Sequence, residues 1–197
     1  YRTSLVGKYT NAYARGAGEG YIPPGWDDWH GHLTALEDGR YYDYWVNDNG
    51  NVVRYGSSPQ DYSADVETQK AVSFVEAEGG RPEPIFLYLA PEAPHLPSRY
   101  AERHGGLFRY ELAPRVPSFN ESHSPDMAAS ARALPLLSPA DIDRLDELQR
   151  WRLRSLSSVE DVLDAVVQAL ARTGRLEKTY IFFTSDNGAL AGKRCDL

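Results

Sequence analysis

An acid and an amide stand side by side near the end of the chain, in Asp186-Asn187-Gly188. They follow a run at 178–184 whose β-branched and aromatic residues are typical of a buried strand. In parallel α/β sheets, ligands bind beyond the carboxyl ends of the strands. Because hard cations prefer carboxylate and amide oxygens, the pair predicts a site for Ca²⁺ or Mg²⁺. The alternative is an ordinary Asn-Gly turn with the acid as a helix cap.

Two further side chains follow predicted strands. Lys8 lies at the end of the predicted strand 3–9, where its ammonium group can bind an anion such as sulfate or phosphate. His95 follows the apolar strand 85–89 in a loop whose three prolines restrict the backbone. An imidazole held there can donate a hydrogen bond to an oxyanion or protonate a leaving group. The alternatives are an ordinary surface lysine and a histidine bonded to its own loop.

The segment Trp26-Asp27-Asp28-Trp29-His30-Gly31-His32 is rich in metal-binding and aromatic residues. His30 and His32 would share a face only on a strand, and the region 11–29 resembles a long irregular loop. This favours a loop that packs its tryptophans over the domain, rather than a zinc site. Stacking of a tryptophan against a sugar ring is a further alternative.

Length and composition indicate one globular domain with an acidic surface. The chain has 197 residues and a net charge of −7, which favours neither a nucleic acid nor an anionic membrane as a partner. No apolar stretch approaches the roughly 20 residues that a membrane span needs. Cys195 is the single cysteine, so no disulfide can form within the chain. We interpret residues 1–197 as the central part of a catalytic domain, incomplete at both ends, so the missing targeting signal says nothing about location.

The pattern of elements predicts an α/β fold. Strands are expected at 3–9, 41–46, 52–55, 85–89 and 178–184, with a hairpin turn at Asn49-Gly50. Helices are expected at 63–77 and from Ser138 to Thr173, the latter as one helix or as two with a bend near 155–158. A long loop is expected at 100–137. Helices that alternate with buried strands indicate a mostly parallel sheet with helices on both faces.

The order of these motifs resembles the sulfatase family, in its N-acetylglucosamine-6-sulfatase and arylsulfatase branch. The resemblance covers essentially the whole chain. It rests on the following segments in order: Gly7-Lys8-Tyr9-Thr10-Asn11, Pro23-Pro24-Gly25-Trp26, Tyr41-Tyr42-Asp43-Tyr44, Tyr62-Ser63-Ala64-Asp65-Val66, Ala93-Pro94-His95-Leu96-Pro97, Pro117-Ser118-Phe119-Asn120-Glu121 and Thr184-Ser185-Asp186-Asn187-Gly188.

The resemblance implies an alkaline-phosphatase-like α/β fold and hydrolysis of sulfate esters. It implies a Ca²⁺ ion, for which Asp186 and Asn187 would be two ligands, and a formylglycine nucleophile made from a cysteine or serine. Lys8 and His95 would contact the sulfate and assist the leaving group, and Asn11 would support substrate binding. The substrate would be a sulfated glycan, such as a glycosaminoglycan, or a small aryl sulfate. The location would be secreted, periplasmic or lysosomal.

Three departures from the family pattern qualify this implication. The formylglycine motif and the upstream acidic pair of the metal site are absent from residues 1–197, and are expected upstream. Leu190 stands where close relatives have a histidine, and the second site lysine is expected beyond Leu197, since Lys193 is too close to the metal motif. The isolated chain is therefore expected to be inactive. Two alternatives remain: a phosphatase or phosphonate-ester hydrolase of the same superfamily, and a non-catalytic relative that binds sulfated glycans.

Overall fold

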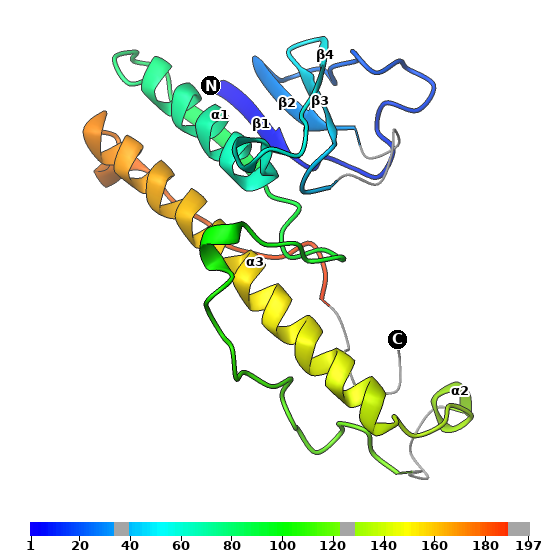
Figure 1. Cartoon of the computed structure of the whole chain (residues 1–197). Helices are drawn as coiled ribbons and strands as arrows, with labels where there is room; N and C mark the ends of the chain where they lie inside the picture. The colour runs from blue at the N-terminus through cyan, green and yellow to red at the C-terminus, as the bar shows by residue number, and fades with distance from the viewer. Residues whose placement is uncertain (34–39, 123–128, 189–197) are drawn as a thin grey trace.

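The computed structural model describes residues 1–33, 40–122 and 129–188 (Figure 1). Leu190 and Lys193 lie outside the described residues. The strands are β1 (Arg2–Gly7), β2 (Asp28–His32), β3 (Trp45–Asp48), β4 (Asn51–Arg54) and β5 (Ile85–Ala90). The α-helices are α1 (Ser63–Ala77), α2 (Ala129–Arg132) and α3 (Pro139–Arg172), and single 3₁₀ turns are η1 (Pro59–Asp61), η2 (Glu102–His104) and η3 (Leu176–Lys178). None of the described helices is both long and apolar enough to cross a membrane.

The five described strands form one mixed sheet in the order β4-β3-β2-β1-β5. β1 pairs in parallel with β2 and with β5, whereas β3 is antiparallel to both of its neighbours. The predicted hairpin joins β3 to β4. Asn49 and Gly50 both have positive φ there, at 51° and 90°, as a tight hairpin turn requires.

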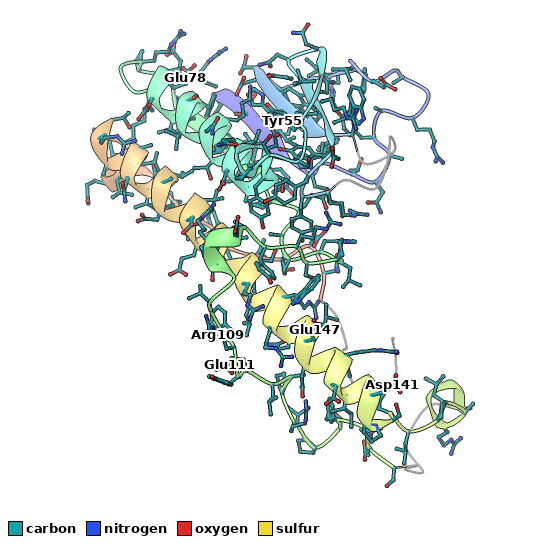
Figure 2. The ribbon with its side chains drawn as sticks, in the orientation of Figure 1. Tyr55, Glu78, Arg109, Glu111, Asp141 and Glu147 are labelled. Carbon is teal, nitrogen blue, oxygen red and sulfur yellow. The ribbon has the colours of Figure 1, made fainter. Side chains whose placement is uncertain are left out.

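Helices α1 and α3 pack together over one face of the sheet (Figure 1). Val6 of β1 lies in one apolar cluster with Phe74 of α1 and Val166 of α3, and Leu87 of β5 packs against this cluster. The first half of α3 projects beyond the sheet, where Figure 2 shows Asp141 and Glu147. Burial of the apolar stripe shared by the two helices therefore fixes α1 against the sheet and α3 against α1.

Aromatic side chains cover the opposite face of the sheet. Trp29 of β2 is fully buried, and its ring lies 5.2 Å from that of Tyr9, 5.3 Å from that of Tyr13 and 5.7 Å from that of Trp26. Trp26 stacks in turn on Phe86 of β5. The tryptophans pack over the domain as predicted. Helices were expected on this second face as well. In the described part of the chain, this aromatic layer covers the face instead.

Several predicted elements need correction. Residues 28–32 were predicted to lie at the end of an irregular loop but form β2, because β1 and β3 supply hydrogen-bonding partners on both sides. The predicted loop at 100–137 contains η2 and α2. Of the two alternatives predicted for 138–173, the single helix is correct: α3 continues through 155–158. Ser155 and Ser158 are fully buried there, where they face Tyr41 and Tyr62.

The predicted strand at 178–184 is wrong. Within the described residues 179–188 the backbone forms no ladder, and Tyr180 and Phe182 are both 89% exposed. The apolar, β-branched composition of this run provides strand propensity only. A strand also needs a neighbour to accept and donate its backbone hydrogen bonds, and no described strand lies alongside.

Asp28 should make the fold sensitive to acid. Its carboxylate accepts hydrogen bonds from Ser4 Oγ at 2.8 Å and Asn49 Nδ2 at 3.0 Å, and it lies 3.1 Å from His30 Nε2. Burial alone would raise the pKa of Asp28, but these partners outweigh it and lower the pKa to about 2. A carboxyl whose pKa is lower in the folded than in the unfolded state adds stability above pH ~4, and this stability is lost as the pH falls toward 2.

We therefore expect Asp28→Asn to lower the free energy of unfolding at pH 7 by about 1–2 kcal/mol, since the side chain is partly exposed. The difference from the wild type should shrink between pH 4 and pH 2. Urea unfolding at a series of pH values measures both quantities. Asp143→Asn, at an exposed position on α3, is the matched control. A difference that stays constant over this pH range would contradict the prediction.

Candidate active site

The candidate site lies at the carboxyl edge of β1 and β5. These strands are parallel and in register, with Gly7 opposite Ala90, so the chain leaves both strands at the same edge. Lys8 comes directly after β1, and the loop with His95 comes directly after β5. The two side chains predicted to contact an anion therefore follow adjacent strands, which is where ligands bind in sheets of this kind.

Gly7 allows the two strand ends to approach closely. Its φ is +102°, and a β-carbon at this position would lie 2.2 Å from the carbonyl oxygen of Ala90. The same carbonyl accepts a hydrogen bond from the backbone N–H of Lys8 at 2.8 Å. Only glycine fits here, because any side chain would collide with β5 and strain the backbone. The position of Lys8 is thus set by backbone contacts rather than by its own side chain.

The structure brings Lys8 together with Asp186. Nζ of Lys8 lies 3.7 Å from Oδ2 of Asp186, although 178 positions separate the two residues along the chain (186 − 8). The lysine side chain is 20% exposed and the aspartate side chain 68% exposed, so the pair opens to solvent. The ammonium and the carboxylate lie at the long end of the ion-pair range, so each can also contact a bound group of opposite charge. This arrangement suits an oxyanion on the lysine and a cation on the acid.

Asp186 and Asn187 offer oxygen ligands of the type that Ca²⁺ prefers. Both side chains are exposed, and the Asn187 amide nitrogen donates to the Gly188 carbonyl at 3.2 Å, which leaves its oxygen free for a cation. The donor set therefore fits a hard cation, yet Ca²⁺ takes 6–8 oxygens. No group of three or more His, Cys, Asp or Glu side chains suited to a metal occurs within residues 1–33, 40–122 and 129–188. Asp186 and Asn187 would therefore form only part of such a site.

His95 is held by its loop and remains exposed. Its backbone N–H donates to the carbonyl of Glu92 at 2.8 Å, and its own carbonyl accepts from the Tyr41 hydroxyl at 2.5 Å. The ring Nδ1 lies 2.8 Å from the carbonyl of Leu96. A carbonyl can only accept a hydrogen bond, so this contact assigns the proton to Nδ1. Nε2 is then the ring nitrogen that is available to a substrate. Asn11, in the turn region after β1, is exposed as well.

The two histidines of the Trp26–His32 segment do not converge on one site. Both lie on β2, on the same face, which is the strand geometry that a shared metal would have required. His30 instead lies between two carboxylates, 3.1 Å from Asp28 and 2.9 Å from Asp48. His32 contacts Glu67 and Glu92. In the described structure, each histidine therefore has its own pair of carboxyl neighbours.

Sequence reasoning missed a buried charged cluster beneath this edge, formed by His32, Arg40, Glu67 and Glu92. Glu67 is 2% exposed, and Glu92 is 3% exposed. One signal in the sequence could have shown part of it. Glu67 lies four residues before Ala71 and seven before Phe74, which places an acid on the apolar stripe of α1.

Comparisons with known proteins give the family of this chain. The profile of the family described as Sulfatase matches residues 1–194. A putative extracellular sulfatase Sulf-1 homolog of Caenorhabditis elegans is 31% identical over 98% of this chain and 27% of its own length. The N-acetylglucosamine-6-sulfatase of Homo sapiens is 34% identical over 98% of this chain and 35% of its own length. The chain thus spans about a third of the length of these relatives.

A solved structure has a similar fold. It is described as a complex with its substrate D-glucosamine-2-N,6-O-disulfate, and it aligns with 89% of this chain and 45% of its own chain at a TM-score of 0.67 and 18% identity. Fold and edge geometry together define an alkaline-phosphatase-like α/β domain, as predicted. The chain belongs to the sulfatase family.

Proposed function

We propose that the full-length protein containing this chain hydrolyses sulfate esters. The observation that carries the proposal is the pairing of Lys8 with Asp186 at 3.7 Å, at the edge where the loop of His95 also begins, in a chain of the sulfatase family. Hydrolysis of a sulfate monoester releases an alkoxide or phenoxide. A site for this reaction needs fixed positive charge on the sulfate oxygens and a proton donor for the leaving oxygen.

Each side chain then has a distinct role. The Lys8 ammonium binds a sulfate oxygen as a point charge. His95, when protonated, contacts the sulfate and can give its Nε2 proton to the leaving oxygen, since Nδ1 is occupied by the Leu96 carbonyl. Asn11 supplies an amide for substrate binding. All three residues follow the carboxyl ends of strands β1 and β5.

Asp186 and Asn187 would hold part of a Ca²⁺ site. The bound cation would draw negative charge from the sulfate oxygens. The remaining ligands and the formylglycine nucleophile would come from parts of the protein outside the described residues. Lys8, at 3.7 Å from Asp186, would keep the sulfate next to this cation.

A sulfated sugar is the substrate class that we favour. One relative is named N-acetylglucosamine-6-sulfatase, and the solved neighbour contains a sulfated glucosamine as its substrate. A relative is also named extracellular, which favours secretion among the secreted, periplasmic and lysosomal locations expected from the sequence. An aryl sulfate is the second candidate.

The test is turnover by the full-length protein of glucosamine 6-sulfate, p-nitrophenyl sulfate and p-nitrophenyl phosphate, each with Ca²⁺ and with excess EDTA. We expect sulfate release that EDTA abolishes. Turnover of the phosphate ester alone would overturn the proposal in favour of a phosphatase. Binding of a sulfated glycan without turnover would instead indicate a non-catalytic relative.

A further inference from the structure

Three buried titratable side chains and the partly exposed Arg40 form a contact network beneath the candidate site. Nε2 of His32 lies 3.2 Å from Oε1 of Glu67, and its Nδ1 lies 3.9 Å from Oε1 of Glu92. The other oxygen of Glu92 accepts a hydrogen bond from Arg40 at 3.0 Å. The four residues come from β2, α1, the loop after β5 and the segment before β3, so this contact network joins elements that are distant in sequence.

The network holds two carboxyl groups but one permanent cation. Burial, and then the nearby Glu92, raise the pKa of Glu67 well above its usual value. Burial also lowers the pKa of His32 to about 4, more than Glu92 can raise it. At neutral pH, burial therefore leaves His32 neutral, and it favours the uncharged form of Glu67. Within this network, the Arg40 guanidinium pairs with the buried Glu92 carboxylate, which avoids an uncompensated buried charge.

This network is linked directly to the loop with His95. The backbone carbonyl of Glu92 accepts the hydrogen bond from the His95 N–H at 2.8 Å. Glu92 is therefore fixed at its side chain by the network and at its backbone to His95. The carboxyl of Glu67 also reaches the end of β1, because a β-carbon at Gly7 would lie 3.4 Å from Oε1 of Glu67. One network thus supports both strand ends that carry the candidate site.

We propose that Glu92 is a positioning residue: its ion pair with Arg40 and its packing against His32 and Glu67 hold the His95 loop in place. Glu92 itself does not touch the substrate. This inference rests on the proposed function for the role of His95, but the order of the loop can be measured without any activity.

The first test is Glu92→Gln in the full-length protein. The variant keeps the shape of the side chain but removes the charge that Arg40 needs. We expect kcat for the sulfate ester to fall roughly 10-fold or more, as for other residues that orient a contacting side chain. KM should change little, because Lys8 still binds the sulfate. Hydrogen exchange of the amides of 91–98 should become faster at the same time.

Two matched variants separate positioning from general destabilisation. Glu67→Gln mimics a protonated glutamate and should preserve exchange at 91–98, whereas Glu67→Ala should accelerate it. Asp146→Asn breaks another buried acid–arginine pair, in which Asp146 lies 2.7 Å from Arg115. Asp146 lies on α3, away from the edge, so its substitution should leave both hydrogen exchange at 91–98 and kcat unchanged.

Three outcomes would overturn the inference: Glu92→Gln with unchanged exchange at 91–98, Glu67→Gln behaving like Glu92→Gln, or Asp146→Asn accelerating exchange at 91–98 equally. If Glu92→Gln does not fold, Arg40→Gln, at a side chain that is 31% exposed, removes the same ion pair. A wild type without sulfatase activity would refute the proposed function alone, because the exchange measurements would still decide the positioning role.

Discussion

Asp186→Ala is expected to lower kcat/KM of the full-length protein for a sulfate ester by at least about 100-fold. Loss of a residue that merely orients a metal ligand typically costs about 10–100-fold in affinity or activity, and Asp186 is proposed as a ligand itself. Its side chain is exposed, and its ion pair with Lys8 is long, at 3.7 Å. The substitution should therefore alter cation binding without unfolding the domain.

The measurement combines a Ca²⁺ titration with steady-state kinetics. In the variant, the Ca²⁺ concentration needed for half-maximal activity should rise, and excess Ca²⁺ should restore part of kcat. Asp143→Ala removes an equally accessible acid from α3 and serves as the control. If Asp186→Ala retained wild-type Ca²⁺ dependence and kcat/KM, Asp186 would be an ordinary turn residue.

Lys8→Ala is expected to lower kcat of the full-length protein by roughly 10²–10³-fold. A fixed charge that stabilises developing negative charge typically contributes this much. The Lys8 side chain is largely buried, with 20% exposed, so little water can replace its ammonium group. Because the backbone of Gly7 and Lys8 is fixed by β5, the truncation should not move the rest of the edge.

Steady-state kinetics with glucosamine 6-sulfate and p-nitrophenyl sulfate measure this effect. Lys8→Arg keeps the charge but spreads it over a planar guanidinium, so it should restore only part of the activity. Lys178→Ala, at an exposed lysine of η3, is the control that should behave as the wild type. A Lys8→Ala enzyme with unchanged kcat would remove Lys8 from the proposed site.

Local patterns were sufficient where neighbours in sequence decide the structure. The Asn49-Gly50 turn, the start of α3 and the strand before Lys8 all follow from short-range chemistry. At α3, for example, the Ser138 hydroxyl accepts from the Asp141 N–H at 3.2 Å, while the Asp141 carboxylate accepts from the Ser138 N–H at 3.1 Å. The placement of Lys8 and His95 at one edge followed from the rule for parallel strands.

Local patterns failed where a distant partner decides. The run at 178–184 has strand composition but no strand beside it in the described structure, whereas residues 28–32 become β2 because β1 and β3 flank them. Propensity is a preference of single residues, but a strand exists only when its backbone groups are paired.

By itself the sequence determined the family, the order of the motifs and the residues that could bind an anion or a cation. It also placed Lys8 and His95 at strand ends, because the carboxyl end of a strand can be read locally. Only the tertiary structure decided that Asp186 lies 3.7 Å from Lys8 and that His32 lies between the carboxyl groups of Glu67 and Glu92. These contacts join residues that are far apart in the chain. Burial, which sets the protonation of Glu67 and His32, is a property of the folded whole.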